Sequence, residues 1–208
     1  MTGRFITFEG GDGSGKSTQS ALLAEWLLGL GREVVTTREP GGTELGVEIR
    51  HLVQHRRGHV APRAEALLYA ADRAHHIATV VRPALERGAV VVQDRYLDSS
   101  VAYQGAGRQL NSEEVRRLSL WAARDLLPDM TFLLDLDPAI SRERLGAGER
   151  VYDRLEAEGG DFPARVRAKY LELAAAEPER FVVLDATLPL AELAGTIRTH
   201  VSTLLDRE

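Results

Sequence analysis

Several features that are common in proteins are scarce or missing in this 208-residue chain, and each excludes a class of protein. There is no cysteine, so disulfide bonds and thiol chemistry are excluded, although this alone does not decide the compartment. The longest apolar stretch, residues 21–30, is interrupted by Glu25 and is too short to span a bilayer. The first residues show no charged and apolar signal segment. We therefore expect a soluble, cytoplasmic protein without a membrane anchor.

Positively charged residues are fewer than negatively charged ones, 26 against 31. The formal net charge is −5, so no basic field favours nucleic acid as a partner. Lysine is rarer still, because only Lys16 and Lys169 occur among 26 basic residues. The apolar content of 44% and charged content of 27% are ordinary for a globular protein. The length suits one domain, residues 1–208, with a sizeable core.

One of the two lysines lies in a glycine-rich segment that follows a strand-like pattern at residues 4–8. The sequence Gly10-x-x-x-x-Gly15-Lys16-Ser17 fills every fixed position of the phosphate-binding loop. Glycines 11, 13 and 15 allow positive φ angles and a close approach of backbone N–H groups to an anion. A helix that starts after the loop adds its unpaired N–H groups. Lys16 is suited to the β- and γ-phosphates of a nucleotide, and Ser17 to Mg²⁺.

Other interpretations of this segment fit less well. A structural turn would not need a lysine at position 16 in a chain that uses arginine almost everywhere. The dinucleotide motif Gly-x-Gly-x-x-Gly fails, because its last position is Lys16 or Thr18. The guanine-binding motif Asn-Lys-x-Asp is absent, because Ser112 follows the only asparagine, Asn111. A helicase or rotary-type ATPase would normally be longer or carry other domains, so a small-molecule kinase fits a chain of this size better.

The rest of the chain alternates strand and helix patterns, which predicts one α/β domain around a parallel sheet. Strands are predicted at residues 4–8, 33–37, 89–93, 130–136 and 181–184. Helices are predicted from residue 17 to about 30, from after 43 to about 55, and over 62–86, 111–127, 161–175 and 190–205, with another starting at 138. Polar clusters at residues 9–18, 38–43 and 94–104 each follow a strand, so they should share the ligand-binding edge of the sheet.

Phosphoryl transfer between two nucleotides also requires cations around the acceptor phosphate, for which the planar guanidinium of arginine is well suited. Arg95, directly after a predicted strand, is the better candidate, the alternative being a surface salt bridge. For Arg73, on a predicted helix, the sequence favours neither role.

The motifs as a set resemble the bacterial thymidylate kinase family. The resemblance lies in residues 9–18, 37–43, 67–73 and 94–105, continues through 133–138, 153–156 and 170–173, and so spans almost the whole chain. The block Asp94-Arg-Tyr-Leu-Asp-Ser-Ser-Val-Ala-Tyr-Gln-Gly105 is the most specific, because phosphate-loop proteins in general do not share it. The implied fold is the three-layer P-loop NTPase fold, with a five-stranded parallel sheet and a lid insertion.

The resemblance implies ATP-dependent phosphorylation of dTMP to dTDP, for dTTP synthesis, with Mg²⁺. A kinase for another nucleoside monophosphate, or a nucleotide-binding regulator without turnover, is the alternative. The implied ATP-binding residues are Gly10, Gly11, Asp12, Gly13, Ser14, Gly15, Lys16, Ser17 and Thr18. The implied metal-site residues are Ser17, Asp12 and Asp94, although Asp94 could instead steady Arg95.

On the acceptor side the resemblance implies a role for each of several residues. Arg73 and Arg95 would hold the phosphate, and Asp12 would approach the 3′-hydroxyl unless it merely favours the turn. The loop of Glu39 and Pro40 would close over the nucleoside, and Tyr69 would stack on thymine unless it is a core aromatic. The remaining dTMP contacts would be Ser99, Ser100 and Gln104 at the base edge and Tyr103 near the 2′ position.

The resemblance also implies a lid at about residues 142–160 and a homodimer. Some members of the family carry a catalytic arginine within the phosphate loop, where this chain has Gly13. The lid must then supply the charge, with Arg144, Arg150 and Arg154 as candidates, each of which could also be a solvated surface residue. Arg150 and Arg154 are expected to be catalytic, together with Asp12, Lys16 and Arg95.

Overall fold

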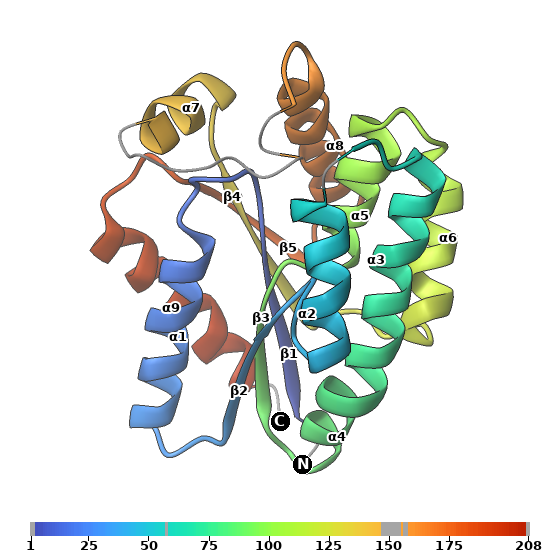
Figure 1. Ribbon diagram of the computed structural model, residues 1–208. Coiled ribbons are helices and arrows are strands. Elements are labelled where there is room, and N and C mark those ends of the chain that lie inside the picture. The colour runs from blue at the N-terminus through green and yellow to red at the C-terminus, as the bar shows by residue number, and fades with distance from the viewer. Residues whose placement is uncertain (1–2, 57, 147–154, 156–157, 207–208) are drawn as a thin grey trace.

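The computed structural model describes residues 3–56, 58–146, 155 and 158–206, and it shows a three-layer α/β arrangement (Figure 1). Five parallel strands form the central sheet in the order β2-β3-β1-β4-β5. The strands are β1 (Arg4–Glu9), β2 (Val34–Arg38), β3 (Val90–Asp94), β4 (Met130–Asp135) and β5 (Phe181–Asp185). The predicted parallel sheet is confirmed, and β1 lies at its centre.

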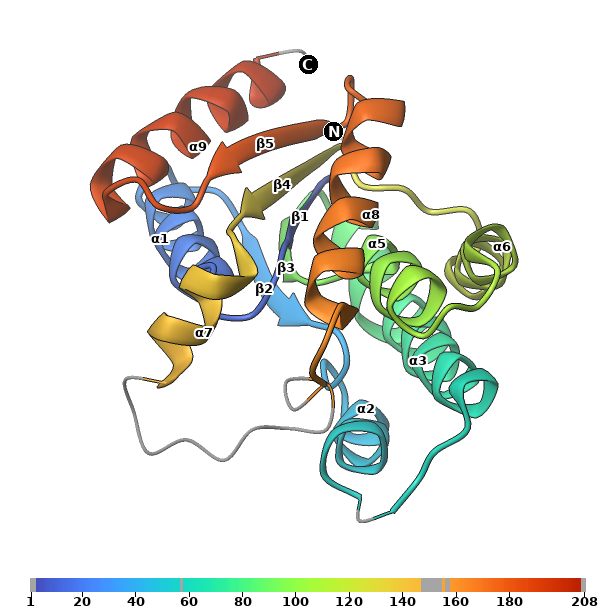
Figure 2. The same ribbon diagram turned by 90° about the horizontal axis from the view of Figure 1, so that it is seen from above.

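Helices cover both faces of the sheet. Seen from above, α1 and α9 lie on one face, and α3, α5 and α8 lie on the other (Figure 2). The helices are α1 (Lys16–Gly29), α2 (Glu44–Arg50), α3 (Pro62–His76), α4 (Arg82–Glu86), α5 (Leu97–Ser100), α6 (Ser112–Ala123), α7 (Pro138–Gly146), α8 (Phe162–Ala176) and α9 (Leu190–Leu205). Within the described part of the chain, no helix is long and apolar enough to cross a membrane.

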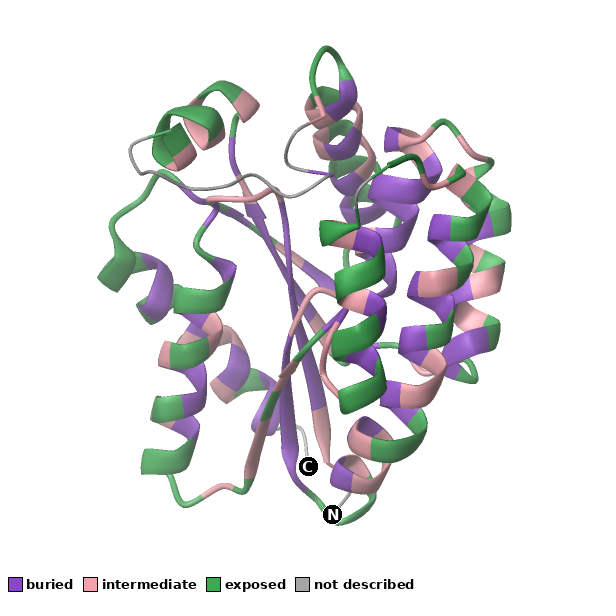
Figure 3. Ribbon diagram, in the orientation of Figure 1, coloured by how far each residue is buried: buried purple, intermediate pink, exposed green. Residues whose placement is uncertain are grey.

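The alternation of side chains along each strand fills a core on both faces of the sheet. Ile6 and Phe8 of β1 pack with the apolar side chains of α1 and α9. Phe5 of the same strand faces the opposite layer and packs with Tyr96 and Leu97. The central strands are buried along most of their length, while the exposed residues lie mainly on the outer faces of the helices (Figure 3).

The structure differs from the sequence-based prediction in two helical regions. No helix was expected between Arg95 and Asn111, but α5 begins at Leu97 and continues into a wider, π-helical segment, Val101–Gly107. The helix capped by Asn111 ends at Ala123 rather than near residue 127. Its end is set by Arg124 and the following residue, which adopt left-handed conformations with φ of 51° and 56°.

A buried ion pair fastens α5 to the sheet. The guanidinium of Arg180, just before β5, donates to both carboxylate oxygens of Asp98 over 2.7 and 2.9 Å. It also donates to the hydroxyl of Thr131 over 2.8 Å. The side chains of Arg180 and Asp98 are only 9% and 1% exposed, so neither charge would be solvated without the other.

We expect Asp98→Ala to lower the free energy of unfolding by about 3–5 kcal/mol, because it leaves the buried Arg180 charge with only the partly exposed carboxylate of Glu177 as an ionic partner. Urea denaturation would measure the loss. The matched control is Glu33→Ala, which removes the exposed ion pair with Arg87 and should cost less than about 1 kcal/mol. Equal losses in the two variants would contradict the assigned role of the buried pair.

Candidate active site

The phosphate-binding loop connects β1 to α1, as predicted. Gly10, Gly13 and Gly15 have positive φ angles of 135°, 72° and 92°, whereas Gly11, which was expected to be among them, does not. A side chain at Gly10 would also place its Cβ 2.4 Å from the carbonyl oxygen of Leu134. The glycines at these positions therefore allow the backbone to turn close to β4 before α1 begins.

Lys16 lies at the first position of α1 and folds back over the loop. Its ammonium group donates to the carbonyl oxygen of Gly11 over 2.7 Å. Burial lowers the pKa of Lys16 to about 8 and outweighs the opposing effect of Asp12. The lysine is therefore a buried cation held at the loop that would take the phosphates.

Ser17 and Asp94 meet where β1 and β3 end. The Ser17 hydroxyl donates to Oδ2 of Asp94 over 2.6 Å. The other carboxylate oxygen of Asp94 is buried and has no hydrogen-bond partner. A hydroxyl beside a carboxylate with a free oxygen is a donor set that suits Mg²⁺, which takes few protein ligands together with phosphate oxygens and water.

Arg95 joins the loop to the segment that follows β3. Its guanidinium donates to Oδ1 of Asp12 over 2.5 Å and to the carbonyl oxygen of Gly10 over 3.1 Å. It also donates to the hydroxyls of Tyr103 and Ser99, each over 3.3 Å. The same guanidinium lies 5.0 Å from the centre of the Tyr103 ring. A planar cation is thus fixed beside the phosphate-binding loop.

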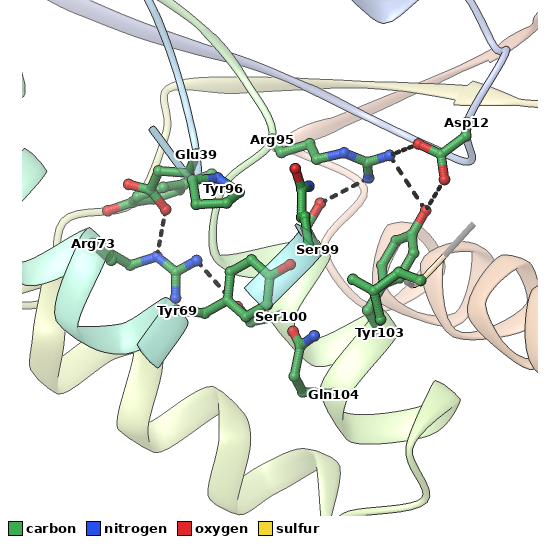
Figure 4. Close-up of a pocket in the computed structure, with 13 residues that line it drawn as sticks. Asp12, Glu39, Tyr69, Arg73, Arg95, Tyr96, Ser99, Ser100, Tyr103 and Gln104 are labelled. Atoms are coloured by element: carbon green, nitrogen blue, oxygen red, sulfur yellow. Dashed lines mark hydrogen bonds and ion pairs between the residues drawn. The ribbon is translucent and has the colours of Figure 1, made fainter. Parts of the chain in front are cut away.

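A pocket extends from Arg95 away from the loop (Figure 4). Its lining includes all the residues that were predicted to contact the acceptor, namely Asp12, Glu39, Pro40, Tyr69, Arg73, Arg95, Ser99, Ser100, Tyr103 and Gln104. They come from the ends of β1, β2 and β3 and from α3, α5 and Val101–Gly107. The inference that the polar clusters after these strands share one edge of the sheet is therefore confirmed by the topology.

Arg73 lies in a different environment from Arg95. The whole residue is 1% exposed, and its guanidinium donates to Glu39 over 2.9 Å, to Ser119 over 3.0 Å and to Ser100 over 3.1 Å. Glu39 also contacts Nδ1 of His76 at 3.0 Å. Figure 4 shows Arg73 and Arg95 on separate sides of the pocket. The two arginines thus have different partners, and the role of each toward a phosphate stays a prediction.

The side-chain amide of Gln104 is oriented by a buried charge. Its Nε2 donates to Oε1 of Glu65 over 3.0 Å, and Arg108 donates to the same carboxylate. An ionised carboxylate only accepts hydrogen bonds, so the amide nitrogen must face Glu65. The amide oxygen of Gln104 is left as the group available to a ligand.

Glu9 was not among the predicted site residues, but it connects several parts of the site through hydrogen bonds. One of its oxygens accepts from the backbone N–H groups of Tyr96 and Ser99, over 2.8 and 3.2 Å. The other accepts from the Ser99 hydroxyl over 2.6 Å and from the Tyr170 hydroxyl over 2.9 Å. A carboxyl group at the end of a buried strand was the only signal of this role in the sequence. Tyr170 was expected within the helix at 161–175 and within the resembling segment 170–173, without a role in the site.

The lid candidates can be placed in part. Arg144, at the end of α7, donates to the carbonyl oxygens of Gly13 and Ala186, over 3.3 and 3.0 Å. It thus lies against the phosphate-binding loop. Arg150 and Arg154, which were predicted to be catalytic, lie outside the described residues. The fold and the site together define a P-loop protein with a second ligand pocket beside its phosphate-binding loop.

Comparisons with known proteins identify the family. The sequence model of the thymidylate kinase family matches residues 8–197. Thymidylate kinase of Clavibacter michiganensis subsp. michiganensis is 69% identical over 205 residues, covering 99% of this chain and 97% of the relative. That of Leifsonia xyli subsp. xyli is 72% identical over 199 residues, covering 96% and 94%. The chain belongs to the thymidylate kinase family.

A solved structure agrees with this assignment. The crystal structure of thymidylate kinase from Ehrlichia chaffeensis superposes with a TM-score of 0.74 at 34% sequence identity. The match covers 88% of this chain and 93% of that one. The predicted family and P-loop fold are therefore confirmed.

We expect Glu9 to make stability depend on pH. Burial, assisted by the nearby charge of Asp98, raises the pKa of Glu9 from 4.5 to about 7. Between these values the folded state keeps a proton that the unfolded state has lost, so the free energy of unfolding falls as pH rises through this window. In Glu9→Gln this contribution is absent. Urea titrations at several pH values should show the wild type losing stability relative to the variant as pH rises toward 7, and a difference that does not change with pH would contradict the assignment.

Proposed function

We propose that this protein transfers the γ-phosphoryl group of ATP to dTMP, forming dTDP for dTTP synthesis. The observation that carries the proposal is the contact of Arg95 with Asp12 and Gly10, which places the acceptor pocket directly against the phosphate-binding loop. A donor phosphate bound in the loop and an acceptor phosphate bound in the pocket would meet at this guanidinium. The family membership names the acceptor class, and the pocket supplies groups suited to it.

On the donor side, the loop from Gly10 to Thr18 would bind the phosphates of ATP through its N–H groups and the start of α1. Lys16 would leave the Gly11 carbonyl and contact the β- and γ-phosphates, where it stabilises the charge that develops during transfer. Arg144 already lies against the loop and would add a second cation. Arg150 and Arg154 remain candidates for the same role.

On the acceptor side, Arg95 would orient and neutralise the phosphate of dTMP. Asp12 shares this guanidinium and lies next to Tyr103, whose hydroxyl donates to it over 3.4 Å. Asp12 is thus placed to accept a hydrogen bond from the 3′-hydroxyl. Tyr103 would crowd the 2′ position and favour deoxyribose.

The far end of the pocket would take thymine. Tyr69 would stack on the ring, with Ser99 and Ser100 near its edge. The amide oxygen of Gln104 would accept from N3–H, since its nitrogen faces Glu65. Arg73, which shares hydrogen bonds with Ser100 and Glu39, is better placed for a carbonyl of the base than for the phosphate. Glu39 would orient Arg73 through their ion pair. It would also support the loop that contains Pro40.

Mg²⁺ fits the pair formed by Ser17 and Asp94, because the second carboxylate oxygen of Asp94 is buried without a partner. Mg²⁺ held by these two residues would supply positive charge that neutralises the transferring phosphates. Asp12 is less suited to hold it directly, because its carboxylate is engaged by Arg95 and Tyr103.

We also propose that the enzyme is a cytoplasmic homodimer. Large apolar side chains are exposed on the outer helices, with Leu67 of α3 57% exposed and Trp121 of α6 78% exposed. Such residues are typical of subunit interfaces.

A substrate panel would test the proposed reaction. A coupled assay with ATP and, in turn, dTMP, dUMP, UMP, CMP and AMP should give the highest kcat/KM with dTMP. The ribonucleotides should be poor substrates because of Tyr103, and CMP and AMP also because they lack the N3–H donor that Gln104 would accept. A preference for any other monophosphate over dTMP would refute the proposal.

We expect Lys16→Met to lower kcat by at least about 100-fold, because it removes a charge that acts mainly on the transition state. The KM for dTMP should change less than about threefold, since the lysine lies on the donor side. Steady-state kinetics with both substrates would measure the two effects, and Lys169→Met, which removes an ion pair with Glu172 on α8, is the matched control. Near-normal turnover in Lys16→Met would contradict the donor-side role.

A further inference from the structure

The backbone of Arg95 has a conformation that is costly for its residue type. Its φ angle is 66°, in the left-handed region, where the Cβ atom of any residue except glycine is crowded. The other non-glycine residues of this kind in the described chain are Gln109, Arg124 and Asp125, which lie at or just beyond helix ends. Left-handed residues are common there. Arg95 instead directly follows a strand, in the middle of the site.

Hydrogen bonds hold the peptide groups on both sides of Arg95. Its N–H donates to the carbonyl oxygen of Phe8 over 2.9 Å. Its own carbonyl oxygen accepts from Nε2 of Gln93 over 3.0 Å. The next N–H, that of Tyr96, donates to Glu9 over 2.8 Å. Two of these three partners are side chains, Gln93 and Glu9, which come from β3 and β1.

Gln93 is poorly explained as a core residue. It is fully buried in β3, after a run of three valines, and its Oε1 has no hydrogen-bond partner. A buried oxygen without a partner costs stability relative to an apolar side chain of similar size. The hydrogen bond from Nε2 to the Arg95 carbonyl is the contact that offsets this cost.

Glu9 fixes the same region from the neighbouring strand. Its carboxylate accepts from the N–H groups of Tyr96 and Ser99, and so caps the start of α5, which has no side-chain cap of its own. It also accepts from the hydroxyls of Ser99 and Tyr170. Both hydroxyls in turn lie within hydrogen-bond distance of Arg95 Nη1, at 3.3 and 3.5 Å.

We propose that Gln93 and Glu9 are positioning residues for the acceptor phosphate, which hold Arg95 in the left-handed conformation that keeps its guanidinium between Asp12 and Gly10. This inference rests on the proposed function, in which Arg95 binds the phosphate of dTMP. Neither residue lies where it would touch the phosphate itself, so both act through Arg95.

A double-mutant cycle tests this dependence. Gln93→Met removes the donor to the Arg95 carbonyl while keeping the length of the side chain. We expect it to weaken dTMP binding by about tenfold and ATP binding by less than about twofold, measured by calorimetry. In an Arg95→Ala background the same change should weaken dTMP by less than about twofold, because the residue through which Gln93 acts is gone.

The matched control is Thr7→Val. It removes a buried hydrogen bond between Thr7 of β1 and Thr131 of β4, and Thr7 is not among the residues that line the acceptor pocket. Its dTMP affinity should equal that of the wild type. A loss as large as that of Gln93→Met would show that any buried polar change in the sheet has this effect, and would overturn the inference.

Two other results of these binding measurements would contradict the positioning role of Gln93. Additive effects of Gln93→Met and Arg95→Ala on dTMP binding would overturn the inference, and so would equal losses for dTMP and ATP. If Gln93→Met does not fold, Gln93→Asn, which shortens the amide by one methylene, gives the same cycle. A wild type that binds no dTMP would instead refute the proposed function.

Stability provides an independent measurement. Arg95→Gly should have a higher urea midpoint than Arg95→Ala, because glycine adopts a φ of 66° without strain. An alanine variant at least as stable as the glycine variant would show that this backbone is not strained, and would overturn the inference.

Discussion

The structure depends on one contact above all, the pairing of the Arg95 guanidinium with Asp12 and the Gly10 carbonyl. It joins the phosphate-binding loop to the pocket that is lined by Glu39, Tyr69 and Gln104. Since β1 and β3 are neighbours in the sheet, their carboxyl ends place these two elements side by side without any long connection. The site is thus a direct product of the strand order.

Much of this arrangement was predictable from the sequence, because the signals were local. The phosphate-binding loop, the five strands and the cap at Asn111 are each encoded within a few consecutive residues. The clustering of residues 38–43 and 94–104 with the loop needed only the rule that ligands bind at the carboxyl edge of parallel strands. All the acceptor candidates proved to line one pocket.

What could not be predicted depends on contacts between residues far apart in the chain. Nothing near Glu9 indicates that it caps α5 or that Tyr170, on α8, donates to it. The contacts of the two arginines also involve distant residues, and only the structure shows that Arg73 is held by Glu39 and Ser119. The helix after Arg95 was missed because its small and polar residues carry no clear apolar period, and its stability comes from packing against α6 and α8.

The hydrogen bond from Lys16 to the Gly11 carbonyl has a consequence for which anions the loop can hold. A phosphate that binds Lys16 replaces this bond instead of adding one, so the net gain comes from charge more than from the number of contacts. Burial, which disfavours the ammonium cation, makes that gain larger for a more highly charged partner. We therefore expect the loop to hold a polyphosphate chain more tightly than an inorganic phosphate ion.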